Sequence, residues 1–309
     1  MKDKVVVVVG PTASGKSSLA IDIAEKKNGE VVSADSMQIY RGMDIGTAKV
    51  SDTRGVKHYL IDIVEPSETF TLSDFLLEAN KAVRHILSKG KLPVMAGGTG
   101  LYVSSFMDNI SLSEVRIDEN YRRQLRDFAA KNGNKKLHEL LKDVDPESYK
   151  ILHPNDEKRI IRALEMVHLS GITVSEQNKI SKLIPSPYDF YVIGLNFKDR
   201  SVLYDRINKR VDDMIAAGFI DEVASLDFES LSQTARQAIG YKQIFEYIKG
   251  TLTLQEAVES IKTESRRYAK RQLTWFRRDS RVNWIYVDEL DCEPTCELFE
   301  TSMEKFLEV

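Results

Sequence analysis

The sequence GPTASGKS, residues 10–17, follows five consecutive valines at 5–9 and precedes a segment with helical periodicity. It fits the pattern G-x-x-x-x-G-K-[ST] in the strand, loop and helix context that this phosphate-binding loop (P-loop) requires. The glycines allow consecutive backbone amides to point inward, and the following helix N-terminus and Lys16 add positive charge. The segment therefore predicts a site for a diphosphate or triphosphate, with the Ser17 hydroxyl as a ligand of Mg²⁺.

The chain around this loop alternates short apolar runs with helical periodicity, which is typical of a parallel sheet covered by helices. Besides the valines, strands are predicted at Val31–Ala34, Tyr59–Val64, Leu92–Ala96 and Phe190–Leu195, and helices at Ser17–Lys27 and Ser73–Ser88. The predicted fold class is therefore α/β, with a P-loop NTPase-like core in which helices flank a parallel sheet.

The strand pattern stops between residues 113 and 185, where apolar residues recur at helical spacing. Here Asn155 is predicted to cap a helix that ends at Gly171. We therefore expect a catalytic core made of residues 1–112 and 186–309, with C-terminal helices, that is interrupted by an all-helical insertion domain at 113–185.

The charge of the chain is unevenly distributed, although its 309 residues sum to a formal net charge of −3. Residues 262–282 contain eight basic and two acidic residues, which gives +6, whereas residues 283–309 contain eight acidic residues and one lysine, which gives −7. Further basic groups lie in the insert, at Arg122, Arg123, Arg126, Lys158, Arg159 and Arg162. A basic helix is often only a solvated face, but three of them in one chain favour a polyanionic partner.

Composition also limits where the protein works and what it binds. No apolar run approaches the roughly 20 residues of a membrane span, and no secretory pattern is present, so we expect a cytoplasmic protein without a membrane partner. The two cysteines, Cys292 and Cys296, and five scattered histidines lack the spacing of a metal centre built from these residues.

Four further residues are candidates for chemistry, each with a structural alternative. Asp35 follows the second predicted strand, at the sheet edge where α/β proteins bind ligands, and could be a general base or a helix cap. Thr99, within GGTG at 97–100, could contact a substrate or cap the next helix. Asp62 could bind magnesium or be structural, and Arg236 could lie on the surface or clamp a diphosphate.

Three stretches together resemble the bacterial tRNA dimethylallyltransferases of the IPP transferase family: GPTASGKS at 10–17, SADSMQIYRGMDIGTAK at 33–49 and GGTGLY at 97–102. The resemblance continues through HYLID at 58–62, NDEKR at 155–159, RALE at 162–165, IGYKQ at 239–243 and KRQLTWFR at 270–277. It covers roughly residues 5–278. Eukaryotic relatives carry a C-terminal zinc finger, whereas this chain ends in an acidic tail and is closer to the bacterial form.

The resemblance implies transfer of a dimethylallyl group from dimethylallyl diphosphate to the exocyclic amine of the adenosine 3′-adjacent to the anticodon of tRNA. It also implies Mg²⁺, a monomer, and an insert that grips the anticodon stem-loop. Carried over by residue, the catalytic set is Asp35 as the base, Thr99 near the reaction centre and Arg236 against the diphosphate. Diphosphate binding falls to Gly10, Thr12, Ala13, Ser14, Gly15, Lys16 and Ser17, with Ser17 also on the metal. The tRNA contacts are Asp35, Ser36, Met37, Gln38, Thr99, Arg123, Lys158, Arg159, Ile160, Ile161 and Arg162.

Other functions share parts of this pattern. A prenyltransferase acting on free adenine nucleotides would need the P-loop and the carboxylate, but the basic helical insert and the GGTG segment argue against it. A nucleotide or metabolite kinase would also use the P-loop and Asp35. A non-catalytic RNA-binding ATPase switch would use the basic helices and would not need Asp35.

Overall fold

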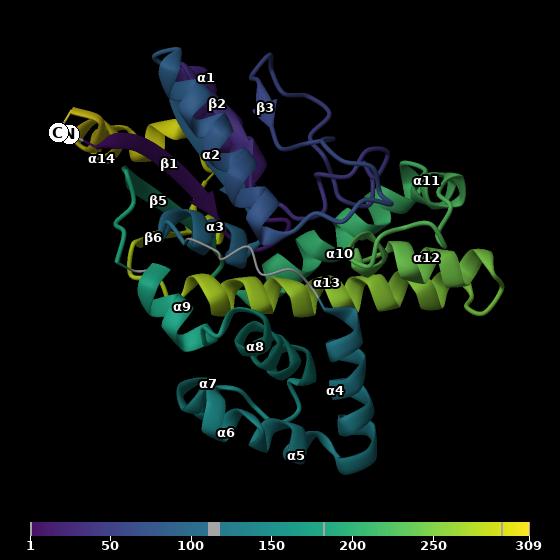
Figure 1. The fold of residues 1–309 in the computed structure, drawn as a ribbon. Coiled ribbons are helices and arrows are strands. Elements are labelled where there is room, and N and C mark those ends of the chain that lie inside the picture. Colours follow the sequence, from purple (N-terminus) through teal and green to yellow (C-terminus); the bar gives the residue numbers. More distant parts are fainter. Residues whose placement is uncertain (1, 111–117, 182, 292, 309) are drawn as a thin grey trace. The chain divides into compact units, whose positions relative to one another are not determined.

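The computed structural model describes residues 2–110, 118–181, 183–291 and 293–308. The chain forms two compact units, one joining Met1–Met107 to Pro187–Val309 and the other comprising Asp108–Ser186 (Figure 1). The predicted start of the insert, residue 113, lies outside the described residues. Among the described residues, no helix combines the length and the apolar character that crossing a membrane requires.

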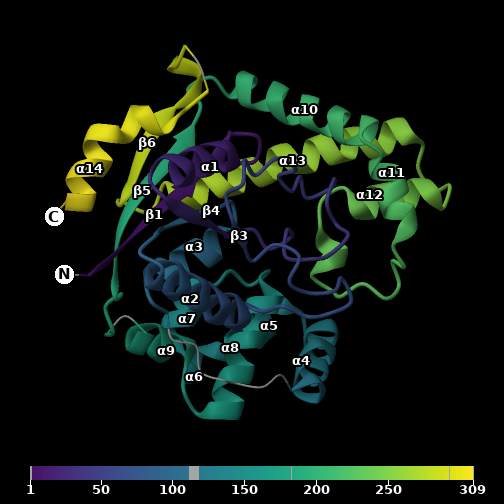
Figure 2. The same ribbon diagram turned by 90° about the horizontal axis from the view of Figure 1, so that it is seen from above.

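The first unit is built on a six-stranded sheet in the order β3-β2-β4-β1-β5-β6, and every neighbouring pair is parallel. Its strands are β1 (Asp3–Val9), β2 (Gly29–Ser33), β3 (His58–Tyr59), β4 (Leu92–Gly97), β5 (Tyr188–Asn196) and β6 (Val282–Tyr286). Helices cover both faces of this sheet (Figure 2), which is why the valines of the central strand β1 are fully buried. The predicted α/β class with a parallel sheet is confirmed.

The helices of this unit support the sheet and the loops at its edge. They are α1 (Lys16–Lys26), α2 (Leu72–Ser88), α3 (Gly100–Met107), α10 (Arg200–Ala216), α11 (Phe219–Ser225), α12 (Tyr241–Ile248), α13 (Leu254–Phe276) and α14 (Glu300–Glu308). Short 3₁₀ turns occupy Ala235–Gln237, Val287–Glu289 and Cys296–Phe299. The longest helix, α13, starts with a capping box in which the Thr253 hydroxyl accepts the Glu256 N–H.

The prediction of a strand over Tyr59–Val64 is wrong for most of its length. Strand β3 covers only His58–Tyr59, because Leu60 and Asp62 adopt positive φ angles of 62° and 55° that a strand cannot accommodate. At the end of the predicted strand, Val64 forms one isolated parallel bridge with Tyr40.

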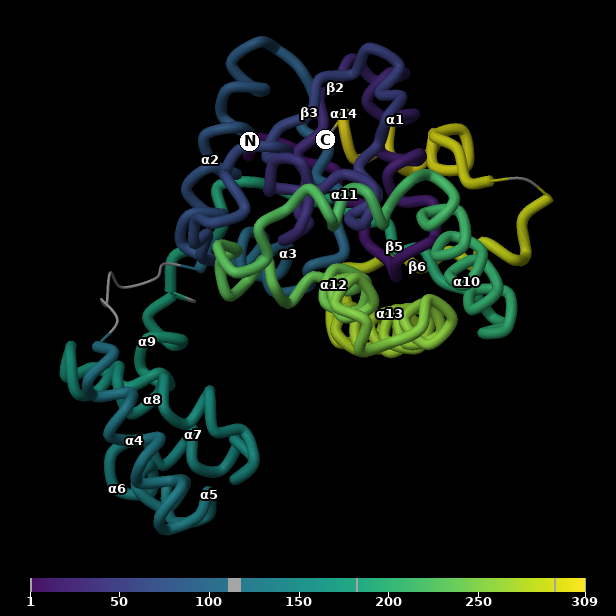
Figure 3. Tube along the Cα trace, turned by 90° about the vertical axis from the view of Figure 1, so that its right-hand side faces the viewer, coloured from purple at the N-terminus to yellow at the C-terminus, as the bar shows by residue number. Residues whose placement is uncertain are grey.

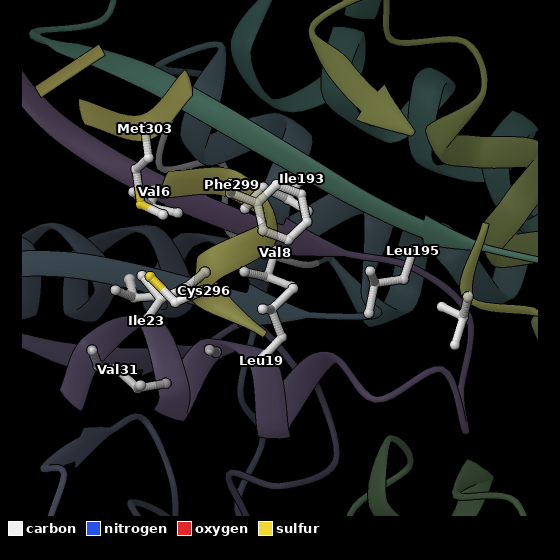
Figure 4. Close-up of a cluster of buried hydrophobic side chains, with 14 of the residues drawn as sticks. Val6, Val8, Leu19, Ile23, Val31, Ile193, Leu195, Cys296, Phe299 and Met303 are labelled. Carbon is white, nitrogen blue, oxygen red and sulfur yellow. The ribbon is translucent and has the colours of Figure 1, made fainter. Parts of the chain in front are cut away.

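The acidic C-terminal tail is ordered over its described residues and completes the core. Cys296, Phe299 and Met303 are buried in one cluster with side chains of β1 and α1, including Val6 and Ile23 (Figure 4). Its glutamates form ion pairs with the last lysines of α1, from Lys26 to Glu297 and from Lys27 to Glu300 and Glu304. The negative charge of the tail is therefore partly matched by the basic end of α1.

The second unit consists of helices, traced in Figure 3: α4 (Glu119–Asn132), α5 (Asn134–Glu139), α6 (Leu141–Val144), α7 (Pro146–Ile151), α8 (Glu157–Ser170) and α9 (Val174–Ser181). Its core is formed by Leu125, Leu137, Leu141, Ile160, Ile161 and Leu164 with smaller neighbours. Helix α8 has Asp156 rather than Asn155 at its N-cap position, one residue later than predicted, and Gly171 closes it as predicted.

Candidate active site

A cavity of about 290 Å³ opens where the strands of the first unit end. Three loops at the carboxyl edge of the sheet line it: the P-loop after β1, residues 35–38 after β2, and the turn that contains Gly98 after β4. Side chains of α10 and α13 and the segments 46–48 and 237–239 complete its wall. Ligands of parallel α/β sheets bind at this edge, so the cavity is the first candidate for an active site.

The P-loop needs glycine at its first position. At Gly10 φ is +153°, and a Cβ there would lie 2.7 Å from the Leu195 carbonyl oxygen, so only glycine fits. The Thr12 N–H donates to Gln272 Oε1 at 2.8 Å, and Lys16 Nζ donates to the Pro11 carbonyl at 2.6 Å. Both donors lie on residues that line the cavity, where phosphate oxygens can compete for them.

The segment after β2 is held by Thr99. Its Oγ1 accepts the Ser36 N–H at 3.0 Å and donates to Ser36 Oγ at 3.3 Å, while Asp35 Oδ1 accepts the Met37 N–H at 2.9 Å. Asp35 lines the cavity, and Thr99 supports the segment that carries it. The hydroxyl of Thr99 is therefore engaged in positioning residues 35–38.

Two partly buried cations, Lys16 and Arg210, share the cavity wall with the Asp35 carboxylate and the exposed Arg271. Burial and the neighbouring Arg210 guanidinium lower the pKa of Lys16 to about 8, and the Asp35 carboxylate only partly offsets them. Burial likewise lowers the pKa of Arg210, although arginine stays charged at any physiological pH. Lys16 and Arg210 are thus close enough to repel each other, which is the arrangement of a site for a multiply charged anion.

Sequence reasoning missed Arg210. It lies on α10 among Ile207, Val211 and Met214, all of which line the cavity. These positions are three or four residues apart on one helical face, so a single arginine in an otherwise apolar stripe was the available signal. Ile207, Val211 and Met214, together with Ile261 from α13, form an apolar part of the cavity lining, here called the hydrocarbon wall. It contrasts with the polar P-loop.

Two residues of α13, Gln272 and Tyr268, also escaped the sequence analysis. Gln272 is buried, accepts the Thr12 N–H and donates to the Gly98 carbonyl at 2.9 Å, so it joins the P-loop to the turn after β4. Burial and the nearby Asp35 carboxylate raise the pKa of Tyr268 to about 12, despite hydrogen bonds with Thr99 and Gln272. Tyr268 therefore remains a neutral phenol in the cavity wall at neutral pH.

The structure does not bring Arg236 into the cavity lining. Its Nε donates to the Leu231 carbonyl at 2.9 Å, and a terminal nitrogen donates to the Glu229 carbonyl. Its guanidinium is therefore turned onto its own loop, although the next residues, Gln237 to Ile239, line the cavity.

The structure favours the structural alternative for Asp62. Its carboxylate pairs with Lys49 at 2.5 Å, and Asp62 is not among the residues that line the cavity. Ser17 does line it, at the start of α1, and its hydroxyl is the kind of oxygen ligand that Mg²⁺ accepts beside phosphate oxygens and water. The described residues contain no cluster of three or more His, Cys, Asp or Glu that could hold a metal. The Ser17 hydroxyl at the P-loop therefore fits a magnesium ion that also binds phosphate oxygens.

The second unit presents only some of the residues predicted to contact tRNA. Lys158 and Arg159 are exposed on the first turns of α8, and Arg123 is exposed on α4. Ile160 and Ile161, also predicted to contact tRNA, have side chains that are at most 4% exposed and pack in the core of this unit.

Arg162 has a structural partner, the fully buried Glu165. Arg162 donates to its carboxylate at 2.6 Å, Arg122 donates twice, at 2.8 Å and 2.9 Å, and the Asp118 N–H also donates at 2.9 Å. Burial opposes ionisation of Glu165, but these bonds outweigh it and lower the pKa of the carboxyl group. Arg122 therefore joins α4 to α8 through Glu165, and Arg162 pairs with the same carboxylate from within α8.

Helix α13 has the basic face that its sequence predicts. Its buried residues near the C-terminal end are Ala269, Gln272, Leu273 and Phe276, and its exposed basic residues are Arg267, Lys270, Arg271, Arg277 and Arg278. Trp275 is 37% exposed and donates through Nε1 to Ser104 Oγ at 2.8 Å. The basic face continues to Arg271, which lines the cavity.

Comparisons with known proteins show which family this chain is similar to. The family described as "IPP transferase" matches residues 38–279, and the family "Isopentenyl transferase" matches residues 3–65. The chain is 47% identical over 294 residues to the tRNA dimethylallyltransferase of Halalkalibacterium halodurans, covering 94% of this chain and 93% of that protein. Identity and coverage are the same for the tRNA dimethylallyltransferase of a Thermoanaerobacter species.

Two solved structures are similar over almost the whole chain. One is the full-length tRNA isopentenylpyrophosphate transferase from Bacillus halodurans, with a TM-score of 0.71 and 42% identity over 99% of this chain and 96% of that one. The other is a eukaryotic dimethylallyltransferase acting on tRNA, with a TM-score of 0.79 and 27% identity over 99% of this chain and 80% of that one.

Proposed function

Because the chain belongs to the IPP transferase family, we propose that its cavity transfers a dimethylallyl group from dimethylallyl diphosphate to the exocyclic amine of the adenosine 3′-adjacent to the anticodon of tRNA, releasing diphosphate. One observation carries this proposal: a P-loop, a carboxylate and a hydrocarbon wall meet in one cavity. The P-loop would bind the diphosphate, and the hydrocarbon wall would contact the dimethylallyl group. The carboxylate would accept the proton of the amine nucleophile.

The P-loop end of the cavity suits the leaving group. As the allylic C–O bond breaks, negative charge develops on the diphosphate, and the loop amides with Lys16 and Arg210 would stabilise it. Mg²⁺ at Ser17 would add charge neutralisation on the diphosphate oxygens. The apolar side chains Ile207, Val211 and Met214 would contact the dimethylallyl group.

Asp35 suits the nucleophile. As the new N–C bond forms, the amine must lose a proton, and the Asp35 carboxylate on the cavity wall can accept it. The adenine must leave the stack of neighbouring tRNA bases to reach this edge of the sheet, as target bases do in other enzymes that modify them. Residues Ser36 to Gln38 line the cavity beside Asp35 and would contact the extruded nucleotide.

Arg236 remains in the proposal as a brace for the diphosphate. Its neighbours Gln237, Ala238 and Ile239 line the cavity, so a rotation of its side chain away from the Leu231 and Glu229 carbonyls would bring the guanidinium nearer to a bound diphosphate. The same proposal includes a monomer that works in the cytoplasm, where its tRNA substrate is found.

The experiment that tests the function supplies purified protein and Mg²⁺ with dimethylallyl diphosphate and either unmodified tRNA or AMP. Mass spectrometry of the nucleosides should show dimethylallyl-adenosine from tRNA alone. Prenylation of AMP but not tRNA would replace the proposal with the free-nucleotide enzyme, and phosphate transfer from ATP would replace it with a kinase.

Exposed cations of the second unit are proposed to bind tRNA phosphates. Replacing Lys158 and Arg159 by alanine should weaken tRNA binding and reduce the slope of log affinity against log salt by about one per lost contact. Lys179→Ala is the matched control, because Lys179 belongs to the same unit and pairs with Glu147. An unchanged salt slope in the double variant would remove these residues from the interface.

A further inference from the structure

The loop of residues 44–49 forms part of the cavity wall, because Gly46, Thr47 and Ala48 line it. This loop follows the 35–38 segment in sequence and lies beside α11 and α12 (Figures 1 and 2). It contains no helix or strand. Its conformation must therefore come from contacts with other parts of the unit.

Glu222 of α11 supplies the main contact. Its Oε2 accepts the N–H groups of Asp44 and Ile45 at 2.9 Å and 2.6 Å, and its Oε1 accepts the N–H of Gly46 at 3.1 Å. The Tyr241 hydroxyl of α12 donates to Oε1 as well, at 2.6 Å. Three successive backbone amides thus converge on one carboxylate, as they do around a bound anion.

Two buried rings press against the same loop. A Cβ at Gly46 would lie 2.3 Å from the ring of Phe219 and 2.5 Å from that of Tyr241, so the backbone touches both rings directly. The rings meet edge to face, with centroids 5.1 Å apart, and both are at most 1% exposed. Glycine is therefore required at position 46, and the Glu222 contact is built on a rigid base.

The other end of the loop has a second anchor. The Lys49 side chain is only 8% exposed, and its Nζ donates to the Tyr40 carbonyl at 2.6 Å. It also pairs with Asp44 at 2.6 Å and with Asp62 at 2.5 Å. The loop is thus fixed at both ends, and only its middle faces the cavity.

The fixed loop in turn orients Gln38. Gln38 Nε2 donates to the carbonyls of Thr47 and Ala48 at 3.4 Å and 3.3 Å, and Gln38 Oε1 accepts from Ser33 Oγ at 3.1 Å. These partners distinguish the two ends of the carboxamide and leave a second lone pair of Oε1 as an acceptor. Carboxamides are well suited to the amine edge of adenine.

We propose that Glu222 is a positioning residue for the nucleotide: it holds the 44–49 loop so that Gln38 presents its carboxamide oxygen toward the amine of the bound adenosine. This inference rests on the proposed function, because it assumes that an adenosine enters the cavity. Glu222 would therefore act on the nucleotide end of the cavity, residues 35–49, and not on its phosphate end, residues 10–17. Its side chain bonds the 44–49 loop and Tyr241, and no described hydrogen bond joins it to the P-loop or to the cavity-lining residues of α10 and α13.

The test compares Glu222→Gln with Asp221→Asn, an exposed neighbour on the same helix, and with the native protein. Glutamine keeps the shape but loses the charge and turns an NH₂ group toward backbone donors, so the loop should shift. We expect the KM for tRNA to rise roughly 10- to 100-fold, while the KM for dimethylallyl diphosphate and the affinity for inorganic diphosphate stay within about twofold of native values. Asp221→Asn should resemble the native protein in all three.

Tyr241→Phe provides a milder variant that keeps the ring packing and removes one of the four donors. We expect it to raise the KM for tRNA by roughly two- to fivefold, again without a change in diphosphate affinity. An unchanged KM for tRNA in Glu222→Gln would overturn the inference, and so would an equal loss of tRNA and diphosphate binding. Native protein that fails to prenylate tRNA would instead overturn the proposed function, so the two failures are distinguishable.

Discussion

The two ends of the cavity are built differently. The phosphate end is a continuous stretch, residues 10–17, whose backbone angles and glycines form the binding groups directly. The nucleotide end, residues 35–49, depends on side chains from far along the chain: Thr99 holds Ser36, and Glu222 holds Gly46 across 176 residues. A continuous motif can bind its ligand through local geometry alone, whereas the nucleotide end needs the complete fold of the unit.

The largest expected effect separates chemistry from binding. Asp35→Asn should lower the single-turnover rate of prenyl transfer roughly 100- to 10,000-fold, because asparagine cannot accept the amine proton. The affinity for inorganic diphosphate, measured by calorimetry, should not fall, since the variant removes a negative charge from the cavity. Asp52→Asn, an exposed carboxylate outside the cavity lining, is the control. A rate within tenfold of the native value would exclude Asp35 as the base.

The next prediction tests whether the P-loop alone binds the diphosphate or whether α10 contributes to the binding. Arg210→Met should weaken inorganic diphosphate binding roughly 10- to 100-fold, because the anion loses one of the two partly buried cations of the cavity wall. Lys209→Met removes an exposed charge from the neighbouring position and should have little effect. Equal affinities for the two variants would show that the P-loop binds diphosphate without help from α10.

The contrast between the two ends also explains what the sequence could predict. The α/β class and the P-loop follow from local patterns: five buried valines, a glycine-rich turn and amphipathic helices. Arg210 and Glu222 belong to none of the quoted stretches, and the role of Gln272, within 270–277, depends on the fold, because it bonds Thr12 across 260 residues. The length of strand β3 was overestimated because residues 60–64 are mostly apolar, as in a strand. Leu60 and Asp62 nevertheless take left-handed backbone angles, which end the strand.

Buried and exposed positions of one helix show the same limit. The basic run of α8 indicated a contact surface, but Ile160 and Ile161 pack inward and Arg162 serves the buried Glu165. Periodicity locates a face of a helix, but it does not tell which charged residues at the border of that face have partners within the protein.

A third effect follows from the pKa of Lys16, which burial and Arg210 lower to about 8. Below pH 8 the amine is charged and attracts diphosphate; above pH 8 it loses its proton in the ligand-free protein, so binding must be accompanied by proton uptake. We expect the affinity to fall by up to about tenfold per pH unit above 8. Lys16→Arg should bind with less pH dependence, because arginine stays charged and the ionisation of the ligand is the same for both proteins. Parallel pH profiles would show that Lys16 does not titrate in this range.

The smallest effect tests the link between the two ends. Gln272 accepts the Thr12 N–H of the P-loop and donates to Gly98, next to the Thr99 that holds Ser36. Gln272→Glu keeps the acceptor but places a carboxylate against the Gly98 carbonyl, which should cost about 1–3 kcal/mol of stability and displace both loops slightly.

We therefore expect both the affinity for inorganic diphosphate and the KM for tRNA to worsen by roughly three- to tenfold in Gln272→Glu. Thr274→Ala on the same helix should change neither, because its hydroxyl bonds only the Lys270 carbonyl of its own helix among the described contacts. If only diphosphate binding weakens, the two ends are independent despite the shared glutamine. If both weaken together, Gln272 couples the phosphate end to the nucleotide end. The two ends would then differ in how the chain builds them but depend on each other in function.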